Sequence, residues 1–408
     1  MTTTINADNG VVSGSAGLKS SADSSGVLAL QTNGTTAVTV GTDQSILMTG
    51  APSIGGAGYG MGMGFRNRII NGAMVIDQRN AGASVTETTT GPFVTDRFAI
   101  DGSSSSKFTG QQSSTAPAGF TNSLVLTSSA ATSVGSTDYY RMYHGIEGYN
   151  IADLGWGTAN AKSVTLSFWV RSSLTGTFGG VARNNATDRI YPFSYTISAA
   201  NTWEQKSITI AGDTSGTWLT TNGMGIQIIW SMGCGTSRQG TAGAWTSTTG
   251  IFTCTGETQL VATNGATFYI TGVQLEKGST ATAFDYRPYT TELQLCQRYL
   301  PAFVLASGEQ AFASGQAYNT TVCIIPLTLP VSARVNPTGL VYTGTISNLK
   351  VYAGSTGISL TALVINGSAS NTTAALNATV ASVTTGVPVL FTTPVSASGT
   401  IYFTGCEL

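Results

Sequence analysis

Apolar and polar residues alternate along several short stretches of this chain, most clearly at residues 164–170. Every second residue there is apolar: Val164, Leu166, Phe168 and Val170. In an extended chain, side chains two positions apart lie on the same face. The pattern therefore predicts a strand with one buried face, and it places Trp169 on the opposite, polar face.

The same alternation returns at residues 207–210, 224–232 and 266–270, and the pairs 222–223 and 264–265 are both Asn-Gly turn signals. After Gly272 the apolar positions shift by one, to Val273 and Leu275, which indicates a bulge at that glycine. Many short strands with almost no helical periodicity predict an all-β chain. We expect a jelly-roll β-sandwich domain over residues 66–289.

Residues 290–301 carry the one clear helix signal. Thr290 or Thr291 would cap a helix from Glu292 to Leu300, and Pro301 would end it. We interpret this segment as a short connector to a smaller C-terminal β-sandwich over residues 302–408, a tip domain of about 100 residues. Its expected strands lie at 322–329, 340–341, 350–352, 358–364, 387–391 and 401–403.

The first 54 residues hold only short apolar patches, such as Leu28 and Leu30, and a hairpin signal at Asn33-Gly34. Strands this short and this few do not bury a core alone. We therefore expect identical chains to wrap together here and to share one core, as an attachment segment or stalk.

Glycine takes every second position from Gly56 to Gly64, and apolar side chains fill most of the positions between. An extended chain would then have one bare face that another strand could approach closely. Residues 55–65 are thus either a closely packed neck or a flexible linker.

Only 9% of the 408 residues are charged, whereas about a quarter is usual for a soluble domain. This leaves little for acid–base chemistry, so we expect a protein that is not an enzyme. The net charge of −1 and the lack of a basic run argue against nucleic-acid binding. No secretory signal and no apolar run of about 20 residues occur, so we expect synthesis in a cytoplasm and no membrane insertion.

Catalytic and metal-binding residues are scarce. His144 is the only histidine and lies in an aromatic stretch, where packing explains it better than catalysis. The five cysteines are expected to be buried free thiols, although a Cys234–Cys254 disulfide stays open. No cofactor is implied, and a structural Ca²⁺ is the one metal left open. Carboxylates for glycoside hydrolysis are available, but their spacing does not pair them: Asp96, Asp138, Glu147, Asp153 and Asp188.

Sugar binding needs aromatic faces next to neutral hydrogen-bonding groups. The candidate rings lie in an aromatic run, on glycine- or serine-flanked loops, or on the polar face of a strand: Tyr139, Tyr140, Tyr143, Trp156, Trp169 and Trp245. For each ring the alternative is that it closes the sandwich core or covers an interface between copies of the chain.

Three stretches carry a resemblance to a known family: residues 66–98 with their Arg-Asn-Arg-Ile-Ile-Asn-Gly start, residues 146–170, and residues 268–288 with their Phe-Asp-Tyr-Arg-Pro end. Together they resemble the jelly-roll, carbohydrate-binding-module-like domain of bacteriophage fibre and tail proteins. Residues 22–34 resemble the attachment end of phage fibres. Such proteins are typically homotrimers with a host-recognition tip.

The resemblance implies a structural protein of a phage virion, made in the host cytoplasm and exposed on the particle. It would be a trimeric tail fibre whose N-terminus attaches to other virion proteins and whose β-domains bind a host-surface polysaccharide. The alternatives are a head-decoration or collar fibre without a receptor site, and a polysaccharide-degrading fibre.

Overall fold

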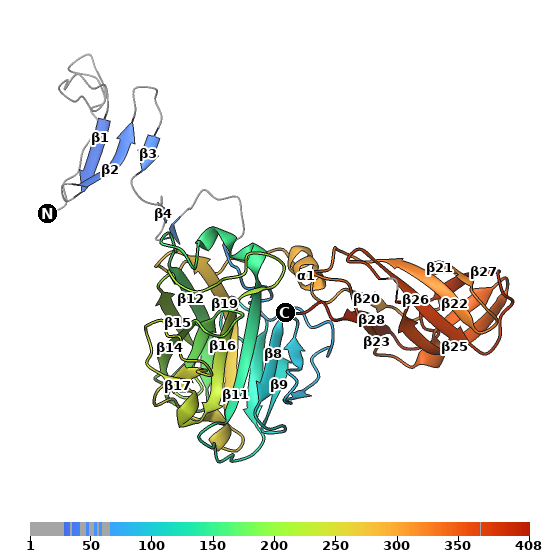
Figure 1. Ribbon diagram of the computed structural model, residues 1–408, viewed down its shortest axis with the longest axis horizontal. Helices are drawn as coiled ribbons and strands as arrows, with labels where there is room; N and C mark the ends of the chain where they lie inside the picture. The colour runs from blue at the N-terminus through green and yellow to red at the C-terminus, as the bar shows by residue number, and fades with distance from the viewer. Residues whose placement is uncertain are drawn as a thin grey trace, which may run out of the picture. The chain divides into compact units, whose positions relative to one another are not determined.

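The computed structural model describes residues 66–408, except residue 368, and five short strands between residues 28 and 58. The chain divides into two units, residues 1–64 and residues 65–408. Regular structure in the described residues is nearly all β, which confirms the predicted fold class (Figure 1). No helix in this part of the chain is long and apolar enough to cross a membrane.

In the first unit, β1 (Leu28–Thr32), β2 (Thr35–Val40) and β3 (Ile46–Met48) form an antiparallel sheet, and β4 (Ser53–Ile54) pairs with β5 (Ala57–Gly58). Thr32 pairs with Thr35, which confirms the hairpin predicted at Asn33-Gly34. Apart from β4 and β5, the stretch from residue 49 to residue 65 lies outside the described residues, and so does most of the expected neck. The core shared between copies stays a prediction.

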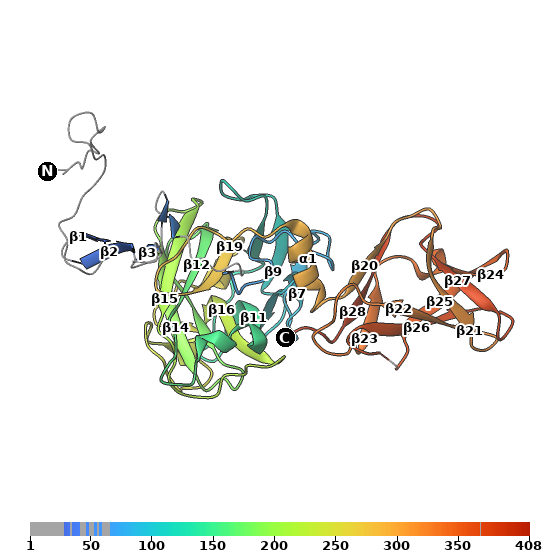
Figure 2. The ribbon, with the colours of Figure 1, turned by 90° about the horizontal axis from the view of Figure 1, so that it is seen from above.

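Two six-stranded antiparallel sheets make up the sandwich of the second unit. The first sheet contains, in spatial order, β15 (Glu204–Ile210), β12 (Val164–Ser172), β19 (Thr267–Lys277), β10 (Ser123–Ser128), β9 (Phe108–Ser113) and β6 (Val85–Thr86). The second contains β14 (Ile190–Ile197), β13 (Gly176–Arg183), β16 (Met224–Cys234), β11 (Tyr139–Glu147), β8 (Phe98–Gly102) and β7 (Phe93–Thr95). The chain crosses repeatedly between the two layers, as in a jelly roll (Figure 2).

A short parallel pair, β17 (Gln239–Gly240) and β18 (Thr253–Cys254), lies in the long connection between β16 and β19. Single 3₁₀ turns complete the connections of the second unit: η1 (Gly148–Asn150), η2 (Ala152–Leu154), η3 (Thr236–Arg238), η4 (Leu260–Ala262) and η5 (Ile346–Asn348). All five cysteines are buried free thiols, so Cys234 and Cys254 are not joined.

Aromatic side chains from both sheets fill the space between the layers, with Trp230, Phe98 and Phe168 all fully buried. Phe168 packs edge-on against Trp230, with 5.9 Å between ring centroids. The four apolar residues predicted to share the inner face of β12 are all in this core. Burying each large apolar side chain stabilises the fold by roughly 1.5–3 kcal/mol, so this core is the main source of stability.

The bulge predicted at Gly272 is present. Ser167 of β12 pairs with Gln274 of β19, but Trp169 pairs with Thr271, so two residues of β19 lie opposite one residue of β12. Gly272 has a φ of +61°, a conformation that glycine adopts without strain. The bulge therefore explains the shift of the apolar positions along this strand.

The C-terminal part is also β, but its arrangement differs from the expected sandwich. Six strands close into a barrel in the order β21 (Ala311–Ala317), β22 (Val322–Thr328), β26 (Thr373–Val380), β25 (Thr356–Ile365), β24 (Lys350–Ala353) and β27 (Pro388–Thr392). A three-stranded sheet accompanies it: β20 (Ala302–Leu305), β28 (Gly399–Thr404) and β23 (Gly339–Tyr342). Closure leaves the barrel strands without a free edge, which the spacing of short strands does not reveal.

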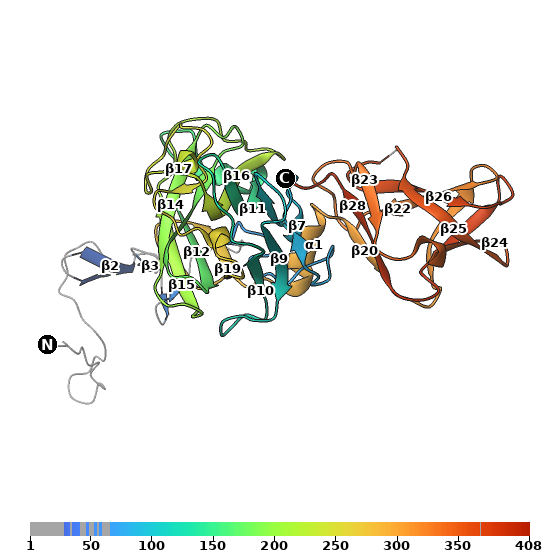
Figure 3. The same cartoon turned by 90° about the horizontal axis from the view of Figure 1, so that it is seen from below.

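The α-helix found among the described residues begins and ends earlier than the sequence predicted. Helix α1 spans Tyr289–Gln297, and Pro288 is its N-cap residue. Proline suits the start of a helix because its missing N–H has no partner to lose there. At the other end, Pro301 disfavours the helical conformation for the residue before it, so the helix stops short of Leu300. Figure 3 shows α1 between the sandwich strands β7 and β9 and the strand β20.

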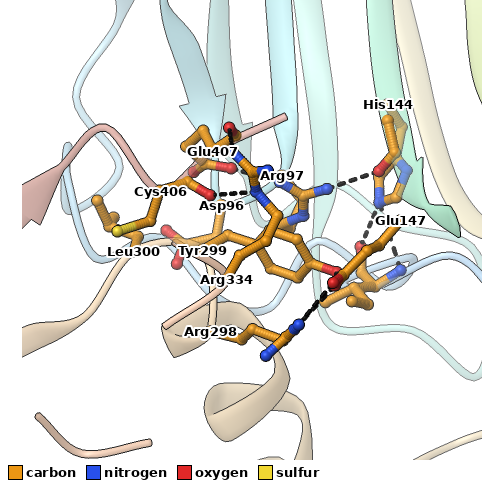
Figure 4. A network of polar contacts seen from close by, with 12 residues as sticks. Asp96, Arg97, His144, Glu147, Arg298, Tyr299, Leu300, Arg334, Cys406 and Glu407 are labelled. Atoms are coloured by element: carbon orange, nitrogen blue, oxygen red, sulfur yellow. Dashed lines mark hydrogen bonds and ion pairs between the residues drawn. The ribbon is translucent and has the colours of Figure 1, made fainter. Parts of the chain in front are cut away.

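A buried polar network joins the sandwich to the last residues of the chain (Figure 4). Arg97 is 1% exposed and forms an ion pair with Glu407, while its Nη2 donates to the carbonyl of Gly145 at 2.6 Å. Its guanidinium also lies 3.6 Å from the ring centroid of Tyr299. Arg79 forms a second ion pair with Glu407 at 3.0 Å. The C-terminus is thus held on the sandwich by two arginines.

A third ion pair of this network links β11 to the end of the helical segment. Arg298 donates to both carboxylate oxygens of Glu147, at 2.5 and 2.8 Å, and the Tyr299 hydroxyl donates to the same carboxylate at 2.7 Å. Burial raises the pKa of nearby Asp96 to about 7, and the negative charge of Glu407 acts in the same direction. Two hydrogen bonds from Gln78 oppose this shift.

The buried network between the sandwich and the last residues of the chain generates a prediction about stability. The substitution Glu407→Ala leaves the buried guanidinium of Arg97 without its carboxylate, and removing one partner of a buried pair costs about 3–5 kcal/mol. Chemical unfolding of the full chain is expected to show this loss. The control Glu309→Ala breaks a half-buried pair with Lys350 and a hydrogen bond from Tyr352, and is expected to lower the unfolding midpoint much less than Glu407→Ala does. Equal unfolding midpoints for the two variants would contradict a stabilising role for the buried Arg97–Glu407 pair.

Candidate functional site

Three of the six candidate rings are turned inward or packed against other rings. Tyr140 is fully buried, with its hydroxyl 2.8 Å from Ser104 Oγ. Trp156 is also buried, and the rings of Trp218 and Trp245 meet it edge-on at 4.6 and 5.4 Å. The prediction that Tyr140 and Trp156 form sugar-binding platforms is therefore wrong, because both rings are buried. Trp245 is half-buried in the same cluster, so it closes the core.

Tyr139 and Tyr143 lie on the outer face of β11, on either side of Arg141. Their rings are already in contact with the Arg141 side chain. The Arg141 guanidinium lies 4.9 Å from the ring centroid of Tyr139 and 5.6 Å from that of Tyr143, and Asp101 binds it at 2.6 and 2.8 Å. Burial, with the charge of Asp101, raises the pKa of Tyr143 to about 12. This cluster secures the face of the second sheet.

Trp169 keeps a partly open ring. It lies on the outer face of β12, opposite the exposed Gln205 of β15. A Cβ atom placed on Gly272 would lie 2.6 Å from the Phe120 ring and 3.1 Å from the Trp169 ring, so the bulge brings both rings against bare backbone. The sequence prediction that Trp169 stands on the polar face is confirmed.

Phe120 belongs to a group of three packed rings, which was not predicted as a site from the sequence. The centroids of Phe120, Phe284 and Tyr286 lie 4.8–5.4 Å apart. Tyr286 is 57% exposed, yet its hydroxyl donates to the carbonyl of Gly119, so its ring is fixed. We call Trp169, Phe120, Phe284 and Tyr286 the aromatic strip.

A hollow of about 230 Å³ lies next to this strip. Its apolar wall includes Phe284, Tyr286 and the 61% exposed Tyr289, and Thr121 adds an exposed hydroxyl. An open ring next to neutral hydrogen-bonding groups is the chemistry that the sequence analysis sought in a sugar site. The signal was present in the Phe-Asp-Tyr-Arg-Pro stretch, where Phe284 and Tyr286 occupy alternate positions.

The charged residues of the hollow hold the backbone. Asp285 accepts hydrogen bonds from the backbone N–H groups of Arg66 and Asn67, at 2.8 and 3.2 Å. Arg287 donates to the carbonyls of Asn67 and Ile69 and forms an ion pair with Glu292. We call Asn67, Asp285 and Arg287 the clamp.

Asn67 extends the clamp into the sheet. Its side chain donates to the carbonyl of Val273 at 3.0 Å and accepts the N–H groups of Ile69 and Leu275 at 2.9 and 3.1 Å. The clamp therefore fixes the end of β19 beyond the bulge and the loop that carries Phe284 and Tyr286. Two of the three stretches that carry the family resemblance meet at the clamp. Because the clamp side chains are bound to backbone groups, their role is to position the rings of the site and not to contact a ligand.

The groups considered for catalysis have structural partners. His144 is fully buried against Phe98 with its Nε2 3.1 Å from the carbonyl of Ile70, and burial lowers its pKa well below the usual value. The five carboxylates each bind different groups: Asp96 binds Gln78, Asp138 binds Ser103, Glu147 binds Arg298, Asp153 binds Arg68 and Asp188 binds Asn184.

No group of three or more His, Cys, Asp or Glu side chains in the described residues is arranged to hold a metal ion. Calcium also binds through backbone and side-chain carbonyl oxygens, so the structural Ca²⁺ that the sequence leaves open stays an expectation.

No protein-family model and no curated protein matches the chain. Solved structures that align with it include the enzymatically active domain of tailspike protein 4 of bacteriophage CBA120, at 11% identity and a TM-score of 0.26 over 45% of this chain and 19% of that one. The chain thus spans about a fifth of the tailspike's length.

Two Clostridium thermocellum structures align in a similar way. The family 11 carbohydrate-binding module of the cellulase Lic26A-Cel5E has 10% identity and a TM-score of 0.25, over 47% of this chain and 96% of that one. The CBM22-1-GH10 modules of xylanase 10B, complexed with xylohexaose, have 12% identity and a TM-score of 0.26, over 50% and 29%. At these TM-scores the similarity carries no argument, and the architecture rests on the sheets themselves.

The aromatic strip depends on the bare backbone at Gly272, which generates a prediction. Gly272→Ala places a methyl group against Phe120 and Trp169 and requires both rings to move. Gly265→Ala is a matched control, because its φ of +74° is equally unfavourable for alanine but nothing lies within 4 Å. We expect Gly272→Ala alone to change the near-ultraviolet circular dichroism of the aromatic residues. Identical spectra for both variants would contradict this packing.

Proposed function

We propose that this protein is a bacteriophage virion fibre protein that binds an uncharged host-surface glycan with its aromatic strip. The observation that carries the proposal is the Tyr286 ring, which is more than half exposed and yet held on one side by Phe120 and Phe284 and at its hydroxyl by Gly119. An exposed ring that is already fixed loses little conformational entropy when a sugar stacks on it.

The polarity of the site favours a neutral ligand. The charged groups lining the hollow, Asp285, Arg287 and Glu292, are bound to backbone groups or to one another. The neutral groups beside the rings are the exposed amide of Gln205 and the hydroxyl of Thr121, which donates to Asn122 at 2.8 Å and keeps its lone pairs for accepting a hydrogen bond. Amides and hydroxyls match the hydroxyl groups of a sugar, while a ring face matches its C–H surface.

The virion role is supported by the sequence resemblance to phage fibre and tail proteins. In this proposal the protein is not an enzyme, its N-terminal segment attaches to other virion proteins, and several copies present their strips together. Linked sites raise avidity by orders of magnitude without any single site being tight. A fibre of the head or collar without a receptor would have the same sheets but no use for an open aromatic strip.

Binding to an array of immobilised bacterial surface oligosaccharides tests the proposal. Covering roughly 60 Å² of one ring face is worth about 1.5 kcal/mol, so Tyr286→Ala is expected to weaken binding about tenfold. Trp169→Ala is expected to have a similar effect. Tyr286→Phe keeps the ring but loses the hydrogen bond to Gly119, so its loss of affinity is expected to be smaller.

Tyr149→Ala is the matched control, because Tyr149 is 61% exposed in the same domain but outside the aromatic strip. Its binding is expected to equal that of the unmodified chain. The proposal fails if no oligosaccharide binds, or if Tyr286→Ala and Trp169→Ala bind as well as Tyr149→Ala.

A further inference from the structure

We propose that the outer face of the second sheet holds a binding site for the carboxylate group of an acidic sugar. Three arginine side chains surround the buried ring of Phe252 on this face. Their guanidinium carbons lie 4.4, 5.4 and 5.6 Å from the ring centroid, for Arg141, Arg183 and Arg238 in that order. We call these three residues the arginine cluster. It belongs to the other sheet from the aromatic strip, so this inference does not depend on the proposed function.

The fold brings the cluster together from segments that are distant in sequence. Arg141 belongs to β11, Arg183 ends β13, and Arg238 ends the turn η3. The strands β8, β11 and β16 lie side by side in this sheet (Figure 1). Met142 and Ala182, which alternate with the two strand arginines, lie in the core between the sheets. The arginines therefore project from the outer face.

Positive charge exceeds negative charge in the cluster. Asp101 binds Arg141 at 2.6 and 2.8 Å. Neither Arg183 nor Arg238 forms an ion pair with a carboxylate in the part of the chain that the structure describes. Glu407, the other carboxylate whose charge acts on this face, is already bound to two arginines outside the cluster. Three guanidinium groups thus have one carboxylate.

Arg183 carries the least compensated of these charges. It is only 9% exposed, and its Nε donates to the neutral amide oxygen of Gln227 at 2.7 Å. Burial lowers the pKa of Arg183 to about 10, and the positive charge of Arg141 acts in the same direction. A buried charge is unfavourable unless it is paired. A bound anion would supply the negative charge that the cluster lacks.

The neighbouring side chains favour a sugar as the carrier of the carboxylate. Tyr139 and Tyr143 lie on either side of Arg141 and are half-buried, so part of each is open to solvent. A guanidinium group binds a carboxylate through parallel hydrogen bonds, while a ring matches the C–H surface of a sugar. The loop that carries Phe252 already packs against this face, so a flat protein surface cannot lie across it.

Calorimetric titration of the full chain with trigalacturonic acid tests the inference. The matched ligand is the methyl ester of the same trisaccharide, which has the same rings without the charge. We expect the acid to bind at least about tenfold more tightly than the ester at about 20 mM NaCl. Its Kd is expected to rise at least about threefold at about 500 mM NaCl, because salt screens the interaction.

Two arginine substitutions locate the site. Arg183→Gln keeps a donor for Gln227 but removes the charge, and is expected to weaken binding of the acid at least about tenfold. The control Arg171→Gln removes an arginine of the first sheet that also lies over a tyrosine ring and donates to a backbone carbonyl. Its binding of the acid is expected to equal that of the unmodified chain.

Thermal unfolding separates a binding role of Arg183 from a purely structural one. We expect the acid to raise the unfolding midpoint of the unmodified chain and of Arg171→Gln, but not that of Arg183→Gln. Tyr286→Ala is expected to keep its affinity for the acid, so failure of the aromatic strip to bind a glycan is distinguishable from failure of this site.

Three results would overturn the inference. The first is equal binding of the acid and its ester to the unmodified chain, a comparison that holds even where Arg183→Gln folds poorly. The second is unchanged binding of the acid to a folded Arg183→Gln variant. The third is a triglutamate peptide that binds the unmodified chain as tightly as the acid does, because the site would then recognise carboxylates without the sugar.

Discussion

The clamp of Asn67, Asp285 and Arg287 is the constraint on which the candidate site depends. Three segments that are distant in sequence meet at these side chains: residues 66–69, the end of β19 after its bulge, and the loop before α1. Hydrogen bonds from charged groups to buried backbone are stronger than those between neutral groups, so the clamp defines one arrangement of this loop. Phe284 and Tyr286 flank Asp285 and are positioned by it. The open strip is thus a consequence of a buried polar cluster.

Several of the protein's few charges are paired in the interior, and the four residues of the aromatic strip are uncharged. The clamp and the joint to the C-terminus contain many of the ion pairs of the second unit. The charged groups next to the aromatic strip are bound to backbone groups or to one another. The proposed glycan site therefore relies on stacking, hydrogen bonding and apolar contact and not on charge.

Local patterns predicted the sheets well, because strand alternation and bulges are set by neighbouring residues. The buried face of β12, the hairpin after β1 and the bulge at Gly272 all follow from spacing alone. Trp156 and Trp245 could not be placed in this way, since their flanking glycines and serines suggest open loops, whereas contacts distant in sequence pack the two rings together. Strands β21 and β26 were missed because alanine, a weak strand former, takes several of their positions. Barrel closure and the open face of Tyr286 likewise depend on long-range contacts.

The most direct test of the account is the salt dependence of glycan binding. The full chain is titrated with the oligosaccharide that binds best on the array, at about 20 mM and about 500 mM NaCl, while tryptophan fluorescence is followed. Because the charges at the site are already paired, the account predicts the same Kd within about twofold at both salt concentrations. A Kd that rises about tenfold or more with salt would contradict a neutral, stacking-based site.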